Sequence, residues 1–155
     1  SLQQGAIDAA EWVGPYNDLA FGLYRAAKYC YYPGWQEPGP TLECMVNKTA
    51  YESLPDDLKA ILDACCRAIN DDMLAEYTAR NQDAFKQLVE IHKVEFRRLP
   101  DSVLAALREQ ADAVLEEPAA KDAFAKRVHD SFVAYREQVR AWSAVSEVPY
   151  FQSRA

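Results

Sequence analysis

The sequence has no glycine and no proline between Pro55 and Pro100, and this uninterrupted stretch limits what the chain can fold into. Apolar side chains recur through it at helical spacing: Leu58, Ile61, Leu62, Cys65, Ile69, Met73, Tyr77, Phe85, Leu88 and Ile91. Asp56 and Asp57 suit the positive end of a helix, and Ser53 is a candidate cap. We therefore predict one very long helix, which spans about 55 Å at the α-helical rise per residue. A helix of this length often bridges two lobes.

The other predicted elements divide the chain by composition. All five glycines and four of the eight prolines lie in residues 1–50, which read as strands and turns, whereas residues 51–155 read as helices. The strands are expected at Gly5–Trp12, Tyr29–Tyr32, Thr41–Asn47 and around Val94–Arg97, and further helices at Tyr16–Lys28, Asp101–Glu117 and Lys121–Ala144. The predicted fold class is α/β, dominated by helix, with a few short strands.

Charge and hydropathy exclude two classes of partner. The chain of 155 residues carries a net charge of −7. Nucleic acid and anionic membrane surfaces both require clustered Lys and Arg, so neither is an expected partner.

No apolar run approaches the ~20 residues that cross a bilayer. The first residues carry neither an initiating Met nor the pattern of a signal peptide, and we expect the chain to be a fragment of a longer protein.

Common catalytic motifs are missing from the sequence, including GxSxG, the Walker loop, HExxH and GxGxxG. His92 and His129 lie in helical contexts without a nucleophile or an acid at motif spacing. We therefore predict that the chain is not an enzyme. Two alternatives remain open. One is a hydrolase or lyase that uses Glu11 and Glu37 as an acid and base pair. The other is a helical module for protein interaction or oligomerisation.

The four cysteines show no metal-ligand spacing. Cys65 and Cys66 are neighbours in the predicted helix, where their side chains point about 100° apart and would pair only with strain. Cys30 and Cys44 flank the turns rich in proline and glycine, and they can face each other across two strands. The alternative is that all four are small buried hydrophobic residues.

Two acidic residues lie outside the solvated helix faces. Glu37 lies between Pro-Gly pairs at 33–34 and 38–39, amid aromatic residues, where a carboxylate needs a positive partner, a metal or a hydrogen-bond donor. Glu11 and Trp12 end a predicted strand at a turn into a helix, where α/β proteins present ligand groups. Adjacent strand residues face opposite ways, so one of the two would contribute through its backbone carbonyl; the alternative is a surface Glu beside a core Trp. Glu11 and Glu37 can share a hard cation such as Na⁺ or Ca²⁺, whose shell a bound organic acid completes.

Two stretches carry a family resemblance: GAIDAAEWVGPYNDLAFGLYRAAKYCYYPGWQEPG at residues 5–39 and LECMVNKTAYESLPDDLKAIL at residues 42–62. They resemble the solute-binding subunits of tripartite ATP-independent periplasmic (TRAP) transporters, and a less specific likeness continues to the end of the chain. The resemblance implies that residues 1–155 form the C-terminal half of a two-lobed periplasmic-binding-protein-like fold (class II). Residues 1–50 would supply its cleft segment, and residues 51–155 its helical segment with the bridging helix.

The same resemblance implies roles for three residues. The E-W and PGW-x-E-PG patterns are similar to those of the subgroup that binds 2-oxo acids, lactate or related hydroxy acids, often with a cation. Glu11, Trp12 and Glu37 are the implied metal ligands, Glu11 through its side chain and Trp12 through its carbonyl. Trp12 and Glu37 are the implied substrate-binding residues. An arginine and a glutamine that complete the family's site come from the N-terminal half and match no residue here.

The resemblance also implies partners and location. The expected ligand is a small organic acid with a Na or Ca ion, in the periplasm. The other expected partners are the N-terminal half and the TRAP membrane subunits. A homodimer through the C-terminal helix would suit the aromatic residues Trp142, Tyr150 and Phe151. Because half of the cleft lies outside this sequence, we expect the chain alone to bind weakly or not at all.

Overall fold

The computed structural model describes residues 1–37, 39 and 42–154. The chain divides into two compact units, Ser1–Leu99 and Pro100–Ala155. Helices make up most of both units, so the helix-dominated α/β class predicted from the sequence is confirmed. Within the described ranges, no helix combines the length and the apolar character that a membrane crossing requires.

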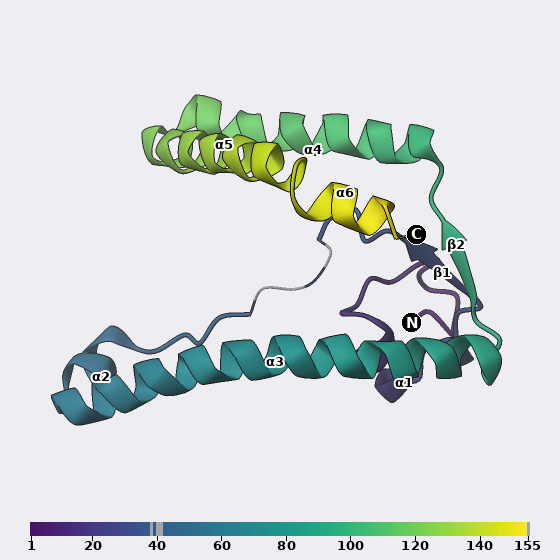
Figure 1. Cartoon of the computed structure of the whole chain (residues 1–155), viewed down its shortest axis with the longest axis horizontal. Helices are drawn as coiled ribbons and strands as arrows, with labels where there is room; N and C mark the ends of the chain where they lie inside the picture. Colours follow the sequence, from purple (N-terminus) through teal and green to yellow (C-terminus); the bar gives the residue numbers. More distant parts are fainter. Residues whose placement is uncertain (38, 40–41, 155) are drawn as a thin grey trace. The chain divides into compact units, whose positions relative to one another are not determined.

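The first unit is built on α3, a helix of 35 residues at Asp56–Glu90 (Figure 1). The prediction of one very long helix is confirmed, but the predicted cap at Ser53 is wrong. Pro55 occupies the N-cap position, and Ser53 instead ends the short helix α2 at Lys48–Glu52. The Ser53 hydroxyl donates a hydrogen bond to the Ala50 carbonyl at 2.7 Å, within the last turn of α2.

The sheet of this unit has two parallel strands, β1 at Tyr29–Tyr32 and β2 at Glu95–Arg98. Both lie where the sequence predicts them. Tyr29 pairs with Glu95, and Tyr32 pairs with Arg98. Parallel strands require a long crossover, and α2 and α3 provide it here.

The buried core of the unit is small and lies where the end of α3 meets β2. The buried apolar residues among those described are Ala84, Leu88 and Val94. Beside them, the rings of Phe85 and Phe96 meet edge to face with centroids 4.7 Å apart. Toward its N-terminus, α3 exposes apolar side chains that include Leu58, Ile61, Ile69 and Leu74. The sheet end of the unit is therefore its best-packed part.

The helix predicted at Tyr16–Lys28 is broken in the structure. It becomes α1 at Pro15–Phe21, which packs against α3, and a short 3₁₀ helix, η1, at Leu23–Arg25. Gly22 lies between them with φ of 77°, in the left-handed region that favours glycine. Its N–H bonds to carbonyls of the last turn of α1, so Gly22 acts as a C-terminal cap.

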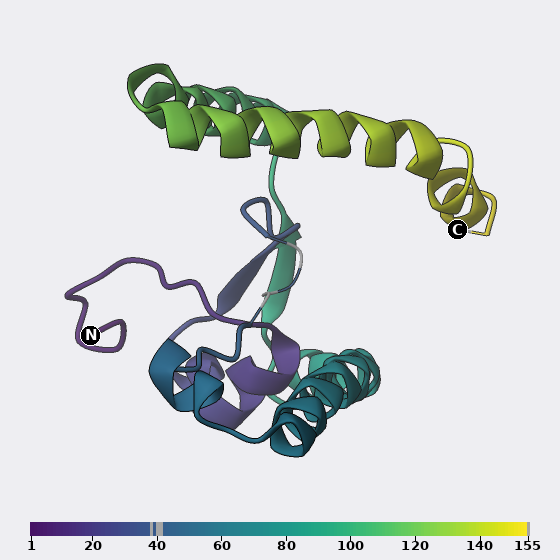
Figure 2. The ribbon, with the colours of Figure 1, turned by 90° about the vertical axis from the view of Figure 1, so that its left-hand side faces the viewer.

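Two predicted strands are wrong. The segment Gly5–Trp12 has the end of a turn, two bends and otherwise irregular backbone, and Figure 2 shows the start of the chain as a coil that loops out from α1. Residues 42–47 are also irregular, while Thr41 lies outside the described residues. This second segment ends at Asn47, whose Oδ1 accepts a hydrogen bond from Ala50 N at 3.0 Å and caps α2. A strand is stable only beside another strand, and the described pairing involves β1 and β2 alone.

The second unit is a helical hairpin of α4 at Asp101–Lys121 and α5 at Ala123–Ser143, followed by α6 at Glu147–Gln152. The first two helices lie close to their predicted ranges. Asp122 joins them and caps α5, since its Oδ1 accepts from Ala125 N at 2.7 Å. One face of α5 remains exposed and carries an apolar row: Phe124, Val128, Phe132, Tyr135, Val139 and Trp142.

Candidate functional site

A cavity of about 370 Å³ in the first unit brings the three predicted site residues together. Glu11 and Trp12 line it from the segment before α1, and Glu37 lines it from the turn after β1. The rest of the lining comes from these segments, β1, α3 and the end of β2: Ala10, Val13, Gly14, Pro15, Tyr31, Pro33, Gly34, Trp35, Gln36, Asn81 and Leu99. The structure thus joins two stretches that stand apart in the sequence.

Asn81 of α3 holds the segment that carries Glu11 and Trp12. Its Oδ1 accepts a hydrogen bond from the backbone N–H of Tyr16 at 2.9 Å, across 65 positions of sequence. The same side chain lies against Gly14, where an added Cβ would come within 3.5 Å of Asn81 Oδ1. Tyr16 is in the first turn of α1, so Asn81 supplies a partner for an N–H group that the helix itself leaves unpaired.

Aromatic contacts reinforce this attachment. The Tyr16 ring meets the Tyr77 ring edge to face with centroids 5.8 Å apart. The guanidinium carbon of Arg80 lies 5.3 Å from the centroid of the Tyr16 ring. Each contact of these kinds contributes roughly 0.5–1 kcal/mol at a partly exposed position. The start of α1 is therefore fixed to α3 by one hydrogen bond and two ring contacts.

Asn81 is not among the residues predicted from the sequence, although the sequence holds a signal for it. Residues 77, 81, 84 and 88 follow helical spacing, so Asn81 takes a place in the stripe formed by Tyr77, Ala84 and Leu88. A polar side chain inside an apolar stripe indicates a specific hydrogen-bond partner. The sequence could not name that partner, because Tyr16 lies in a different element.

The turn that carries Glu37 depends on Gly34. A Cβ at Gly34 would lie 2.7 Å from the Glu37 carbonyl oxygen, closer than such atoms approach without a shift of the backbone. Any other residue would therefore displace Glu37. The Tyr32–Pro33 peptide bond that precedes the turn is cis. The second predicted turn, at 38–39, lies partly outside the described residues because Pro38 is not among them.

The Trp12 ring is half exposed and packs against the ring of Phe21 in α1, with ring centroids 5.5 Å apart and planes inclined by 30°. Trp35 adds a second half-exposed indole ring from the turn after β1. The backbone at Glu11 and Trp12 is irregular, so strand alternation does not send their side chains to opposite faces. The lining therefore combines two indole rings with two carboxylates.

The charge of this lining is negative. Among the described residues it includes the carboxylates of Glu11 and Glu37 and no Lys or Arg side chain. An anionic ligand would need a bound cation or a positive group from elsewhere to enter it. In the described part of the chain, no group of three or more His, Cys, Asp or Glu side chains is placed to hold a metal ion. Hard cations such as Na⁺ and Ca²⁺ take oxygen ligands, which include carboxylates and backbone carbonyls.

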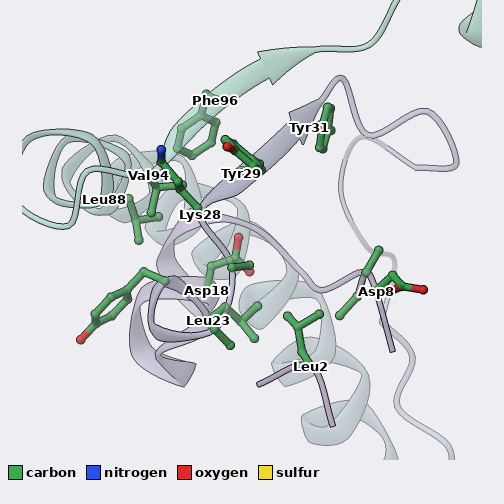
Figure 3. A pocket seen from close by; sticks show the side chains of 16 residues that line it. Leu2, Asp8, Asp18, Leu23, Lys28, Tyr29, Tyr31, Leu88, Val94 and Phe96 are labelled. Atoms are coloured by element: carbon green, nitrogen blue, oxygen red, sulfur yellow. The ribbon is translucent and has the colours of Figure 1, made fainter. Parts of the chain in front are cut away.

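A second cavity, of about 480 Å³, shares Ala10 and Tyr31 with the first. Figure 3 shows Asp18 of α1 among the side chains that line it. Burial, together with the negative charge of Glu11, raises the pKa of Asp18 to about 6, although a backbone hydrogen bond at Gly14 opposes the rise. The sequence does not single out Asp18, because the burial of its side chain depends on packing between distant segments.

Asp18 predicts a pH dependence of stability. Its folded pKa of about 6 exceeds the ordinary value of 3.8, so the folded chain binds this proton more tightly than the unfolded chain does. The contribution of Asp18 to the free energy of unfolding is fully present below the pKa of the unfolded chain, and it is lost as the pH rises through the pKa of the folded chain. We expect Asp18→Asn to become more stable than the unchanged chain as the pH rises from about 4 to about 6.5.

Thermal melts followed by circular dichroism would measure this difference. Because Asp18 is partly exposed, solvent screening limits the expected gap in melting temperature to a few degrees. Asp8→Asn is a matched control, since Asp8 is an exposed carboxylate that lines the same cavity. A gap between Asp18→Asn and the unchanged chain that stays constant over this pH range would contradict the prediction.

The chain is similar to solute-binding proteins over most of its length. Residues 1–122 match the family described as bacterial extracellular solute-binding protein, family 7. A monocarboxylate 2-oxoacid-binding periplasmic protein of Nostoc sp. strain PCC 7120 is 40% identical over 150 residues. That match covers 97% of this chain and 41% of the relative.

Two solved structures are also similar to the chain. One is a TRAP periplasmic solute-binding protein from Pseudoalteromonas atlantica T6c that contains bound sodium and pyruvate. The two chains are 40% identical and superpose with a TM-score of 0.91, and the match covers 98% of this chain and 46% of that one. The other is a TRAP transporter solute-binding protein from Bordetella bronchiseptica RB50, a dimer with calcium and picolinate, with a TM-score of 0.94 and 32% identity over 99% of this chain and 45% of that one.

These matches place the chain among the extracellular solute-binding proteins of bacteria, and the resemblance to TRAP solute-binding subunits is confirmed. The chain belongs to the bacterial extracellular solute-binding protein family 7. It spans less than half the length of the curated relative and of both solved chains.

Proposed function

We propose that the chain is the C-terminal half of a TRAP transporter solute-binding protein, which captures a small organic acid of the 2-oxo acid or lactate type in the periplasm. The observation that carries this proposal is the convergence of Glu11, Trp12 and Glu37 on one cavity. Those residues stand in a chain 40% identical to a 2-oxoacid-binding protein. Residues 1–50 then supply the cleft segment, and residues 51–155 supply the helical segment.

In the proposed site, the Glu11 carboxylate and the Trp12 carbonyl ligate Na⁺ or Ca²⁺. Glu37 contacts the organic acid or its cation, and the Trp12 ring forms part of the pocket wall. The negative lining supports a cation here, because the carboxylate of the acid would otherwise meet two carboxylates of the protein. The sodium with pyruvate and the calcium with picolinate in the two solved relatives also support this arrangement.

The proposed mechanism is capture without a chemical reaction. The N-terminal half supplies the opposite wall and a positive group for the carboxylate, and the two lobes close on the acid. The TRAP membrane subunits then receive it. The chain is thus a binding protein and not an enzyme, in line with relatives that are named for binding.

A second copy of the chain is the proposed partner for the exposed apolar row on α5. One solved relative is a dimer, which supports this pairing. The alternative, a helical interaction module without a ligand, would use the long helix α3 as its surface and would not need Glu11 or Glu37. Light scattering on the purified chain, combined with the binding experiment below, separates these cases.

The binding experiment compares this chain with a chimera that joins it to the part of the Nostoc relative outside the match. Calorimetric titration with pyruvate in Na⁺ or Ca²⁺ should give a dissociation constant in the micromolar range for the chimera, or about −8 kcal/mol. The chain alone should bind more weakly than about 1 mM, because half of the cleft is absent. A folded chimera that binds no 2-oxo or hydroxy acid would overturn the proposed function. Micromolar binding by the chain alone would overturn the half-site.

A further inference from the structure

Phe21, the last residue of α1, exposes a large aromatic side chain beside the candidate site. Its exposed fraction is 72%, so the side chain adds little to the buried core of the first unit. Its ring instead packs against the ring of Trp12, with centroids 5.5 Å apart and planes inclined by 30°. Aromatic rings attract each other at centroid separations of roughly 4.5–7 Å. Phe21 therefore has a specific partner, and that partner lines the cavity.

Phe21 contacts Trp12 from outside the cavity. Among the described residues, the lining includes Trp12 and Pro15, the first residue of α1, but not Phe21. A ligand in this cavity would therefore meet the ring of Trp12 and not the ring of Phe21. Because Phe21 does not reach the ligand, its effect on binding passes through the position of the Trp12 ring.

The helix α1 fixes the backbone that carries the Phe21 ring. At the start of α1, Asn81 of α3 accepts a hydrogen bond from a backbone N–H of the first turn at 2.9 Å. At its end, the N–H of Gly22 bonds to carbonyls of the last turn and closes the helix directly after Phe21. The Phe21 ring thus meets Trp12 from a helix that is held at both ends.

Trp12 contributes two different groups to the proposed site, its indole ring to the pocket wall and its carbonyl to the cation. The backbone at Trp12 is irregular and its ring is half exposed. An exposed side chain changes rotamer within picoseconds to nanoseconds unless a neighbour restricts it. The contact with Phe21 acts on the ring and not on the carbonyl. It therefore differs from the hydrogen bond of Asn81, which holds the backbone at the start of α1.

We propose that Phe21 is a positioning residue that holds the Trp12 ring in the wall of the candidate site. With Phe21 in place, the indole ring already occupies the position in which the organic acid contacts it. Without Phe21, the ring samples other rotamers, and binding of the acid has to restrict that freedom again. The effect on the acid rests on the proposed function, whereas the position of the ring is a property of this chain alone.

Tryptophan fluorescence of the chain tests the position of the ring. The chain has three tryptophans, so Trp35→Phe with Trp142→Phe leaves Trp12 as the reporter. In this background, Phe21→Ala should lower the fluorescence anisotropy of Trp12 and speed its quenching by acrylamide. Phe21→Tyr keeps an aromatic ring and should restore both values. Leu74→Ala is the matched control, because it removes an equally exposed apolar side chain, 71% exposed, from α3. It should change neither value.

Pyruvate binding by the chimera tests the consequence for the site. Phe21→Ala should weaken binding by about three- to tenfold, and Phe21→Tyr should restore it. Phe21→Leu, which keeps an apolar side chain without a ring, should lose affinity as well and guards against a folding defect in the alanine variant. The ratio of the dissociation constants without and with added Na⁺ or Ca²⁺ should stay unchanged, because the Glu11 carboxylate and the Trp12 carbonyl keep their places.

The outcomes separate this inference from the proposed function. Unchanged fluorescence of Trp12 in Phe21→Ala, or full pyruvate affinity in the folded variant, would overturn the positioning role and leave the proposed function intact. A loss of affinity that Phe21→Tyr does not restore, or a changed cation ratio, would show a general disturbance of the segment and would also overturn it. A folded chimera that binds no 2-oxo or hydroxy acid would overturn the proposed function, and the fluorescence of Trp12 would then decide the position of the ring.

Discussion

Replacing Glu11 with Gln in the chimera should weaken pyruvate binding by about 10- to 100-fold and remove its dependence on added Na⁺ or Ca²⁺. The amide has nearly the shape of the carboxylate but lacks its charge. In the proposed site, Glu11 is the side-chain ligand of the cation, and the cation is what allows an anionic acid to approach Glu37. Calorimetric titrations with and without added cation would measure both effects.

Asp8→Asn is the matched control for this substitution. Asp8 is an exposed carboxylate in the same irregular segment, three residues before Glu11, but it lines the other cavity. The charge change is identical, so a long-range effect of net charge would appear in both variants. We expect less than about a twofold change for Asp8→Asn. Equal losses in the two variants, or a cation dependence that survives in Glu11→Gln, would contradict direct ligation by Glu11.

The sequence predicts the elements whose signals are local. The long helix α3 follows from helical spacing without glycine or proline, β1 follows from a short aromatic run, and β2 follows from Val94 and Phe96 just after the helix. The segment Gly5–Trp12 is wrongly predicted as a strand, because a short apolar pattern does not show whether a neighbouring strand is there to pair with it. Gly22 divides a continuous helical pattern, since one left-handed residue ends a helix whatever follows it.

The candidate site divides in the same way. Turn chemistry and an unexpected acid mark Glu37, a strand-like end before a Gly-Pro turn marks Glu11 and Trp12, and the structure places all three around one cavity. Their roles in binding stay predictions. The sequence does not predict the role of Asn81, because that role comes from a hydrogen bond with Tyr16, 65 positions away. Periodicity locates a residue on a helix but does not show which distant segment lies against it.

Asn81→Ala should lower the free energy of unfolding of the chain by about 1–3 kcal/mol. The substitution removes the acceptor for the Tyr16 N–H, a partly buried bond of 2.9 Å, and leaves that donor without its partner at the start of α1. It also opens space beside Gly14. Urea denaturation followed by circular dichroism would measure the loss as a lower midpoint at unchanged slope.

Two further variants separate the hydrogen bond from other effects at this position. Asn81→Asp keeps an acceptor oxygen for Tyr16 and should retain most of the stability. Gln82→Ala is the matched control on the same helix, because Gln82 is exposed and its amide bonds only to the Thr78 carbonyl one turn earlier, at 3.1 Å. It should change stability by less than about 0.5 kcal/mol. Equal losses for Asn81→Ala and Gln82→Ala would contradict a specific stabilising role for the hydrogen bond between Asn81 and Tyr16.

The same variants test whether the hydrogen bond between Asn81 and Tyr16 positions the candidate site. Once Asn81→Ala frees the start of α1, the segment with Glu11 and Trp12 loses its fixed position beside the turn that carries Glu37. In the chimera we therefore expect Asn81→Ala to weaken pyruvate binding by about tenfold or more, at a temperature where the protein remains folded. Gln82→Ala should bind as the unchanged chimera does. Full affinity in a folded Asn81→Ala chimera would mean that the carboxylates of Glu11 and Glu37 are positioned without the hydrogen bond between Asn81 and Tyr16.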